Sequence, residues 1–262
     1  MKQLITGSEG LLGGEIKKLL KCNSIPHEVL RHPSCLDLSG YDTVIHCSAY
    51  GNHSFQTNSE DIIQANILNT YNLLEASKKA KIKTFIMIGT SSEYGMKVKP
   101  MREDSPCHPQ GFYAISKHCA SLLTLEYRKF FNALVLRPFS IYGEREAEHR
   151  LIPKIINSIK TDKPIEIVNA YHDWIHVSDV ANLIKVLIDK PISGILNCGT
   201  GVQTDNVDIV AMLQKISGKK INMVRHDVKL TNWVADTEKM FKIYQPKIDL
   251  FTGLKMVYDA QK

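Results

Sequence analysis

Two side chains that could form an acid/base pair stand four residues apart, at Tyr113 and Lys117. Residues at this spacing project from one face of a helix, and the sequence predicts a helix from 113 to about 131. A free tyrosine has a pKa of about 10, and a nearby ammonium lowers it because the positive charge favours the phenolate. The same spacing recurs at Tyr258 and Lys262, so the first pair gains its meaning only from the residues around it.

A turn with three glycines near the start of the chain is typical of a dinucleotide site. Leu4 and Ile5 form a short apolar run, as in a buried parallel strand. After the glycines, Ile16, Leu19 and Leu20 recur at helical spacing. Between them, Gly7 can supply a tight turn, and Gly10 lets the backbone approach a diphosphate. Gly13 lets the helix lie close to its strand. The position of the turn between strand and helix favours a dinucleotide over a turn without a ligand.

The next predicted strand, residues 27–30, ends at Arg31. In a dinucleotide fold, an acid at this strand end binds the ribose 2′-hydroxyl of NAD, whereas an arginine accommodates the 2′-phosphate of NADP. Arg31 therefore favours NADP(H) over NAD(H), and a solvated arginine in a loop is the alternative interpretation. A very short third strand is expected at 35–38, where Asp37 would accept a hydrogen bond from the adenine amino group.

Strands alternate with helices along the rest of the chain. We predict strands at 42–49, 84–88, 133–138 and 194–199, a strand at 165–168 outside the main sheet, and helices at 60–80, 113–131, 151–160 and 178–189. This alternation predicts an α/β fold with a doubly wound parallel sheet, whose ligands bind beyond the carboxyl ends of the strands. The hydroxyl row that begins at Thr90 follows strand 84–88 and is therefore expected at the ligand edge.

The composition narrows the class of protein. The chain has 262 residues, of which 44% are hydrophobic and 23% are charged, as in ordinary soluble globular proteins. No apolar run approaches the roughly 20 residues that cross a bilayer, and six scattered cysteines suit reduced thiols in the cytoplasm. The net charge of +6 is diffuse, without the basic stripe of a nucleic-acid binder. His172 and His176 lack the helical HExxH pattern of a zinc site. We therefore expect no membrane, nucleic-acid or metal partner.

With these motifs in place, the chain resembles the extended short-chain dehydrogenase/reductases, and within them the nucleotide-sugar epimerase/dehydratase family. The resemblance covers essentially the whole chain and is also carried by residues 44–46, 66–76, 136–143, 173–180, 197–201 and 235–237. It implies a Rossmann-type NAD(P)-binding domain of residues 1–143 and 174–200. A small α/β C-terminal substrate domain would comprise residues 144–173 and 201–262. It further implies a homodimer formed through the helices at 60–80 and 113–131.

The resemblance also implies a role for each site residue. Tyr113 would be the acid/base group, Lys117 would bond the nicotinamide ribose, and Thr90 would hydrogen-bond the reacting sugar oxygen. Further cofactor-binding residues would be Gly7, Ser8, Glu9, Gly10, Leu11, Leu12, Arg31, Asp37, Leu38, His46, Cys47, Ser48, Asn66 and Pro138. The substrate, a nucleoside-diphosphate sugar, would meet Ser91, Ser92, Ser140 and Arg225. Of these, Arg225 would bind the diphosphate, because a guanidinium pairs well with phosphate oxygens.

Four features depart from the usual pattern of the family. The region around the second and third strands is shortened, so at least one helix on that flank is expected to be missing or vestigial. His172 stands where arginine is common, and Ser140 stands where many members have asparagine. Thr90 replaces the commoner serine but keeps the hydroxyl. The shortened flank puts the adenosine contacts of Arg31 and Asp37 in question.

The residues after Thr90 narrow the subclass. The 4,6-dehydratases place Asp-Glu there, whereas this chain has Ser91-Ser92, so water elimination would lack its acid and base. The 3,5-epimerase-reductases that make GDP-fucose carry cysteine at the position of Ser92. A 4-ketoreductase or a 4-epimerase remains, and residues 89–95 look most similar to reductases of the CDP-paratose synthase type. The alternatives are a nucleotide-sugar 4-epimerase with tightly bound NAD and a non-catalytic NADP-binding regulator.

Overall fold

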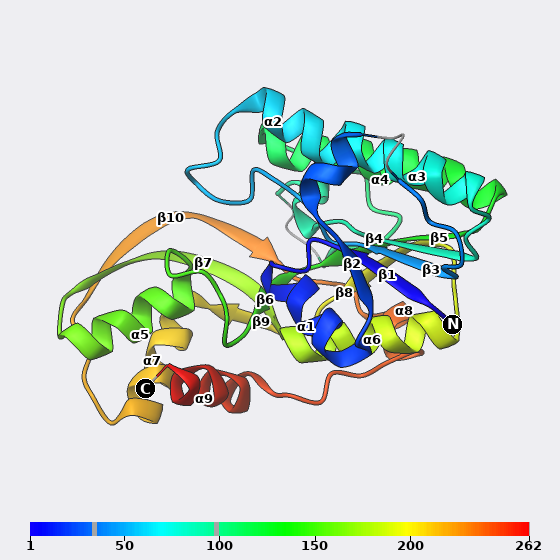
Figure 1. The fold of residues 1–262 in the computed structure, drawn as a ribbon. Coiled ribbons are helices and arrows are strands. Elements are labelled where there is room, and N and C mark those ends of the chain that lie inside the picture. Colours follow the sequence, from blue (N-terminus) through cyan, green and yellow to red (C-terminus); the bar gives the residue numbers. More distant parts are fainter. Residues whose placement is uncertain (33–35, 97–99, 262) are drawn as a thin grey trace. The chain divides into compact units, whose positions relative to one another are not determined.

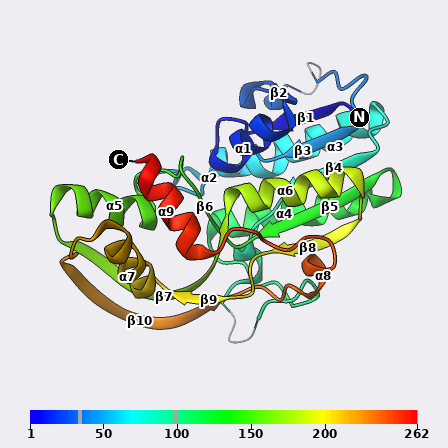
Figure 2. The same cartoon turned by 90° about the horizontal axis from the view of Figure 1, so that it is seen from below.

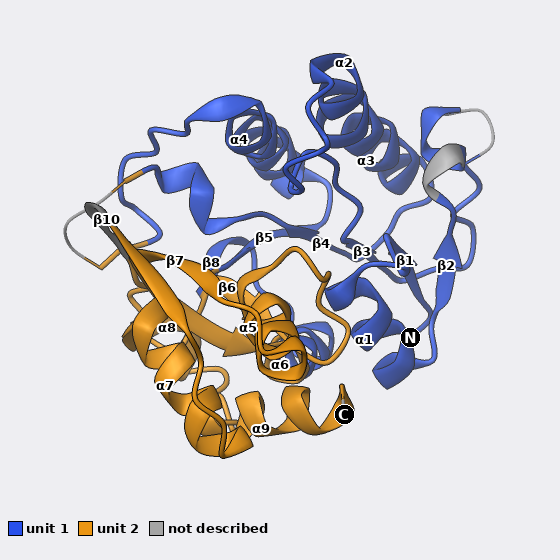
Figure 3. Ribbon diagram, turned by 90° about the vertical axis from the view of Figure 1, so that its left-hand side faces the viewer, with its two compact units in different colours: residues 1–95, 103–138, 181–197 blue, residues 96–102, 139–180, 198–262 orange. Residues whose placement is uncertain are grey.

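The computed structural model of the protein describes residues 1–32, 36–96 and 100–261, which belong to two compact units (Figure 3). Unit 1 comprises Met1–Gly95, Glu103–Pro138 and Ala181–Asn197, and unit 2 comprises Met96–Arg102, Phe139–Val180 and Cys198–Lys262. Relative to the domains expected from the sequence, unit 2 also takes in residues 96–102, 139–143, 174–180 and 198–200. Both units are therefore assembled from discontinuous segments of the chain.

Unit 1 is organised around a six-stranded sheet. In spatial order its strands are β2 (Asn23–Ile25), β1 (Gln3–Thr6), β3 (Thr43–His46), β4 (Thr84–Ile88), β5 (Asn132–Pro138) and β8 (Gly194–Cys198). The first five pair in parallel. Every residue of β4 is buried, as are all residues of β5 after Asn132. Such continuous burial is what a parallel sheet with both faces covered requires.

Helices cover both faces of this sheet (Figure 1). The helices α3 (Asn69–Lys79) and α4 (Gly111–Glu126) lie on one face, and α1 (Leu11–Leu20) and α6 (Val177–Asp189) lie on the other. On the α3 and α4 side, Leu73 of α3 and Ala120 of α4 pack with Phe85 of β4 and Val135 of β5 in one buried apolar cluster. The predicted doubly wound α/β fold is confirmed.

The flank beyond β1 differs from the sequence-based prediction. The strand predicted at residues 27–30 is wrong, because His27–Arg31 forms a 3₁₀-helix, η1. Pro26 precedes it with φ −60°, a value that suits the start of a helical turn. The second strand of the sheet is instead β2, which pairs with β1 from the polar residues Asn23 and Ser24.

The third strand predicted at residues 35–38 is also wrong, since residues 36–38 form no strand. Cys35 itself lies outside the described residues. Among the described residues between β2 and β3, η1 is the one helical segment, and the predicted loss of a helix on this flank stays a prediction. The sheet therefore ends at a three-residue edge strand on the side of the expected adenosine contacts.

The helix predicted at 60–80 contains an irregular turn. Its first part is α2 (Ser59–Ile63), which is capped by the side chain of Asn58. A π-helical turn, η3 (Gln64–Leu68), then leads into α3. Because π turns often occur at functional sites, the side chains of this turn bear on the position of the site.

Unit 2 has its own sheet and core. The parallel strands β7 (Ile165–His176) and β10 (Met223–Trp233) run side by side (Figure 2), while β6 (Ser140–Tyr142) and the antiparallel β9 (Gln203–Asp205) also pair with β7. The helices of this unit are α5 (Leu151–Thr161), α7 (Asn206–Ser217), α8 (Glu238–Phe241) and α9 (Leu250–Ala260). Four isoleucines of α5 pack with α7, α9 and β7 in a second apolar cluster. Within the described residues, no helix has both the length and the apolarity to cross a membrane.

Candidate active site

The turn between β1 and α1 has the shape of a diphosphate cradle. Gly7 has φ +70°, and a Cβ added there would lie 2.6 Å from the backbone nitrogen of Ser48. A Cβ at Gly13 would overlap the carbonyl oxygen of Gly7, so glycine alone lets α1 pack this close to the turn. At Gly10, a Cβ would meet its nearest atom only at 3.5 Å.

The start of α1 offers hydrogen-bond donors to an anion. Gly10 is the N-cap of α1, and no side chain in the described part of the chain caps it. The first turn of α1 contains no acidic residue, so its free N–H groups and positive helix end favour a negative ligand. The cradle at Gly7 and Gly13 therefore fits the diphosphate of a dinucleotide.

The predicted contact residues within the turn differ in exposure. The Ser8 hydroxyl donates to the Glu9 carboxylate at 3.1 Å near the surface. Leu12 is buried in the core, so only its backbone can reach a ligand, whereas Leu11 is half-buried. The turn would thus bind a cofactor mostly through main-chain groups.

His46 at the end of β3 is fixed in one tautomer by a buried chain of hydrogen bonds. The Thr70 hydroxyl donates to the Asn66 carbonyl at 2.7 Å, so it must accept from Nε2–H of His46 at 2.9 Å. Nδ1 of His46 then accepts from the Thr6 hydroxyl at 2.7 Å, and Thr6 accepts from the backbone N–H of Ser48 at 3.3 Å. The ring of His46 thus holds the end of β3 against Thr6 of β1 and Thr70 of α3.

The neighbouring Cys47 is a neutral thiol. Burial raises its pKa to about 12, although the charge of Lys117 acts in the opposite direction. A thiol with such a pKa is inert as a nucleophile at neutral pH. Cys47 can therefore contribute shape and backbone groups to the site, but not covalent chemistry.

Asn66 links the irregular helix to the predicted catalytic helix. Its amide oxygen accepts from the backbone N–H of Tyr50, and its amide nitrogen donates to the carbonyl of Tyr50, each at 2.8 Å. The same nitrogen lies 2.9 Å from the hydroxyl of Ser116 on α4, and Ser116 donates to the carbonyl of Tyr113. Asn66 is fully buried in the π turn η3, so it fixes α4 relative to the loop after β3.

The hydroxyl row after β4 forms a capped turn. The 3₁₀-helix η4 (Ser91–Tyr94) begins at Thr90, whose hydroxyl oxygen accepts from the backbone N–H of Ser92 at 3.2 Å. The Glu93 carboxylate accepts from the backbone N–H of Thr90 at 3.0 Å, which completes a capping box. Because the oxygen of Thr90 already accepts a hydrogen bond, its O–H is left to donate to another group. Ser91 is buried, and Ser92 is half-buried.

Tyr113 and Lys117 lie on the first two turns of α4, as predicted. Tyr113 is half-buried, whereas Lys117 is only 2% exposed. Burial lowers the pKa of Lys117 to about 8, and the negative charge of Glu93 opposes that effect. No hydrogen bond to the Lys117 ammonium is found within the part of the chain that the structure describes, so its N–H groups can serve a bound molecule.

Comparison with known proteins identifies the family of the chain. Residues 30–199, well over half of the chain, match the model of the NAD dependent epimerase/dehydratase family. The chain belongs to this family. It is an NAD(P)-dependent oxidoreductase of the extended short-chain dehydrogenase/reductase type, which agrees with the resemblance drawn from its motifs.

Relatives within the epimerase/dehydratase family differ in activity. The chain is 28% identical to GDP-6-deoxy-D-talose 4-dehydrogenase of Aggregatibacter actinomycetemcomitans, over 93% of this chain and 91% of that protein. UDP-glucuronic acid 4-epimerase from Bacillus cereus, solved with NAD, is 27% identical, with a TM-score of 0.85 over 99% of this chain and 96% of that one. RMD from Pseudomonas aeruginosa, solved with NADPH, shares the fold at 22% identity, with a TM-score of 0.88 over 99% and 98% of the two chains.

The adenosine side of this family member departs from the sequence-based prediction. Arg31 ends η1 rather than a strand, and its guanidinium lies 3.6 Å from the Asp61 carboxylate. Asp37 is exposed and accepts from the backbone N–H of Ser39 at 2.9 Å. Hydrogen bonds from the Ser39 side chain and then from its backbone lower the pKa of Asp37. Leu38 is buried in the core of unit 1. Arg31 therefore does not lie at a strand end, as the sequence-based argument assumed. A contact of Arg31 with the 2′-phosphate of NADP stays a prediction.

Two of the predicted substrate residues of this family member belong to unit 2. The hydroxyl oxygen of Ser140 on β6 lies 3.3 Å from Nδ1 of His172 on β7. Burial and the nearby charge of Arg150 lower the pKa of His172 to about 4, so its ring is neutral at pH 7. The two positions that depart from the family's usual residues therefore contact each other.

Arg225, the other predicted substrate residue of unit 2, lies on β10 and is exposed. Its guanidinium lies 2.6 Å from the amide oxygen of Asn169, once that amide is oriented so that its nitrogen donates to Asp205. This contact holds one N–H group of the guanidinium fork against Asn169. Pro138, the last predicted cofactor residue, is buried at the end of β5.

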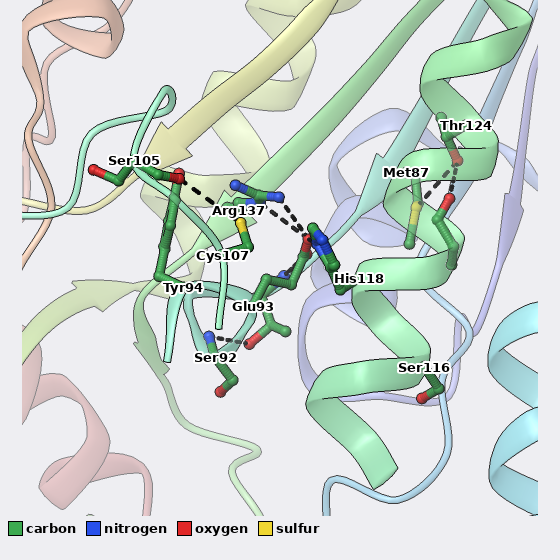
Figure 4. Close-up of polar contacts among 12 residues, drawn as sticks. Met87, Ser92, Glu93, Tyr94, Ser105, Cys107, Ser116, His118, Thr124 and Arg137 are labelled. Carbon is green, nitrogen blue, oxygen red and sulfur yellow. Dashed lines mark hydrogen bonds and ion pairs between the residues drawn. The ribbon is translucent and has the colours of Figure 1, made fainter. Parts of the chain in front are cut away.

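Sequence reasoning missed a buried ionic cluster in this enzyme. Glu93 and Arg137 are both buried, and their charged groups lie 2.7 Å apart, with His118 beside them (Figure 4). The one available signal was an arginine in the otherwise apolar strand at 133–138, because a buried charge needs a partner. Nothing local identified Glu93 as that partner.

Proposed function

We propose that this enzyme is an NADPH-dependent reductase of a nucleoside-diphosphate 4-keto-6-deoxy sugar. The observation that carries the proposal is that the turn after Thr90 has no carboxylate available to the substrate. Ser91 and Ser92 stand where elimination would need an acid and a base, and Glu93, the one acid of this turn, is buried against Arg137. With water elimination disfavoured, hydride transfer at a sugar carbon remains as the chemistry of the site.

The relative from Aggregatibacter supports reduction at C4. A dehydrogenase that acts on C4 of a 6-deoxy sugar and a reductase of the 4-keto sugar catalyse one reaction in opposite directions. The chain matches that relative over 93% of its own length. The nucleoside-diphosphate part of the proposal rests on the same relative and on Arg225, which is well suited to phosphate oxygens.

Each residue of the site would then have a defined task. The cofactor supplies the hydride. Tyr113 would give its proton to the keto oxygen as negative charge develops there, and the O–H of Thr90 would donate to the same oxygen. Lys117 remains charged below its pKa of about 8, where it favours the phenolate of Tyr113 and so makes that tyrosine a stronger acid.

We also propose that the protein is a homodimer. Exposed apolar side chains gather on the elements that the resemblance places at the dimer interface. They include Leu68 of η3, Tyr71 of α3, and Ile115 and Leu122 of α4. Exposed apolar groups on neighbouring helices are well suited to a second copy of the same surface.

Arg31 is proposed to select NADPH over NADH. Its side chain is 46% exposed, so its 3.6 Å pair with Asp61 is weak and can exchange for a phosphate. A charge-assisted contact with the 2′-phosphate is worth about 1.5–3 kcal/mol, or about ten- to hundredfold in affinity. Arg31→Ala should therefore weaken NADPH binding by this factor and leave NADH binding nearly unchanged, as measured by cofactor fluorescence titration.

The control for Arg31 is Arg128→Ala, which removes another surface arginine of unit 1 that donates to a backbone carbonyl. This variant should bind both cofactors as the wild type does. Equal losses for NADPH and NADH in Arg31→Ala, or no loss for either, would reject Arg31 as the selector.

The fate of the cofactor distinguishes a reductase from the alternative, a 4-epimerase. A reductase consumes one NADPH per turnover and must release the oxidised form, whereas an epimerase oxidises and re-reduces one sugar on a retained NAD. The shortened flank at β2 and η1 should weaken the grip on adenosine and favour exchange. We expect the protein to purify largely without nucleotide, and NADPH absorbance to fall when nucleoside-diphosphate 4-keto-6-deoxy sugars are added.

The epimerase alternative has support of its own, since the chain is 31% identical over 218 residues to UDP-glucuronate 4-epimerase of Thermodesulfobacterium geofontis. Denatured extracts that release stoichiometric NAD, together with interconversion of UDP-sugar 4-epimers without added cofactor, would decide for the epimerase.

A further inference from the structure

The carboxylate of Glu93 joins three elements at the predicted catalytic centre (Figure 4). Its Oε1 accepts a hydrogen bond of 3.0 Å from the backbone N–H of Thr90, a residue of the turn after β4. Its Oε2 accepts from Nε and Nη2 of Arg137 on β5 at 3.1 and 2.7 Å. The same oxygen lies 3.3 Å from Nδ1 of His118 on α4. His118 directly follows Lys117, so one buried side chain connects the turn of Thr90 with the helix of Tyr113 and Lys117.

The Glu93–Arg137 pair of this cluster is isolated from solvent. The side chains of Glu93 and Arg137 are 0% and 2% exposed, and the guanidinium lies 4.5 Å above the ring of Tyr94. Glu93 is the only carboxylate that pairs with Arg137 among the described residues, and Nη1 of Arg137 is buried there without a hydrogen-bond partner. Burial of a charge pair is weak support for stability as such, so a cluster in this position invites a functional explanation.

We propose that Glu93 is a positioning residue of the reaction: its buried carboxylate fixes the turn that carries the Thr90 hydroxyl and holds a negative charge beside the helix that carries Lys117. This inference rests on the proposed function, in which Thr90 and Lys117 both serve the keto group. Glu93 does not touch the substrate, because its carboxylate is fully enclosed.

The electrostatic part of this role follows from the groups that face Lys117. Glu93 of η4 acts on it with negative charge, whereas Cys47 after β3 is a neutral thiol at pH 7 and adds no charge there. Arg137 of β5 and His118 of α4 contact the Glu93 carboxylate as its hydrogen-bond donors. Burial raises the pKa of Glu93, but its contacts with His118 and Arg137 outweigh that effect and lower it. Glu93 is therefore ionised at neutral pH and opposes the loss of the Lys117 proton.

The decisive variant is Glu93→Gln, which keeps the size of the side chain and an oxygen for the Thr90 N–H but removes the charge. Because Arg137 would then be buried without a counter-charge, this variant can unfold. The double variant Glu93→Gln/Arg137→Gln removes both charges. It replaces Glu93→Gln in the titration if Glu93→Gln does not fold. Glu93→Asp is the opposite case, since it keeps the charge on a shorter side chain. The matched control is Glu103→Gln, at another buried glutamate of unit 1 that accepts from the backbone of Asn197.

The measurement is the pKa of Lys117 by NMR of protein labelled at the lysine ¹³Cε, with Lys117→Met to assign the resonance. We expect titration near pH 8 in the wild type and in Glu103→Gln. In Glu93→Gln, or in the double variant, it should move down by about one to three pH units, the range that one nearby charge produces. In the same variants, the alkaline limb of the kcat/KM profile should move to lower pH. Glu93→Asp should keep the pKa of Lys117 and lower kcat through a displaced Thr90.

An unchanged pKa of Lys117 in a folded variant without the Glu93 charge would overturn the inference, as would full kcat in Glu93→Asp. The NMR titration needs no substrate, so its result is independent of the reductase assignment. A shifted Lys117 in an enzyme that reduces no 4-keto sugar would support the role of Glu93 and reject the proposed function.

Discussion

Replacing Tyr113 with phenylalanine should lower kcat by about 10²–10⁴, the loss typical of a missing proton-transfer group. The substitution removes only the hydroxyl group. The hydrogen bond from the Ser116 hydroxyl to the backbone carbonyl of residue 113 is kept. The fold and the affinity for NADPH should therefore stay close to those of the wild type. Steady-state oxidation of NADPH with a 4-keto sugar measures kcat, and cofactor fluorescence measures binding.

Tyr258→Phe is a matched control, because Tyr258 begins the chain's second Tyr-x-x-x-Lys pattern. It lies in the core of unit 2 and is 9% exposed. Loss of its hydroxyl should leave turnover unchanged. If Tyr113→Phe retained wild-type turnover, the acid/base assignment would be wrong. If both variants lost activity together, the effect would be one of folding rather than of proton transfer.

Gly13→Ala should nearly abolish dinucleotide binding and also destabilise the protein. In a helix interior, alanine normally stabilises relative to glycine by about 0.5–1 kcal/mol. Here the new methyl group would overlap the carbonyl oxygen of Gly7, so α1 must move away from the turn. A displacement of about 1 Å can weaken a positioned contact by about 10²-fold. We therefore expect a Kd for NADPH raised by about that factor and a lowered Tm.

Gly10→Ala separates ligand contact from packing. Its methyl group meets nothing closer than 3.5 Å, and its backbone is extended at φ −75°, which alanine adopts freely. The Tm should change little, while the Kd for NADPH should rise because the methyl group projects where the diphosphate approaches. Wild-type affinity in Gly10→Ala would show that the phosphates do not approach this residue.

The sequence by itself determined the parts of the molecule whose signals are local. The turn at Gly7–Gly13 was predictable, because its glycines lie between a strand and a helix that local apolar patterns indicate. Strand 84–88 was predictable because a continuous apolar run suits a strand covered on both faces. The helix predicted to carry both Tyr113 and Lys117 was also predictable, and both residues lie on α4.

The flank at residues 23–38 was decided by tertiary pairing. The run at 27–30 has the composition of a strand, yet Asn23–Ile25 occupies the place beside β1 despite its polar sequence. An edge strand is hydrogen-bonded on one side only and needs little apolar surface, so hydrophobic pattern does not reveal it. Pro26 fixes the φ angle that starts η1 instead.

The buried cluster was also decided by the tertiary structure. In the sequence, Glu93 looks like a surface acid in a polar turn, because its partner Arg137 is 44 residues away. Only the pairing of β4 with β5 brings the end of one strand beside the other, and only the packing of α4 adds His118. A buried charge becomes stable where donors from several elements meet, and no local pattern records such a meeting.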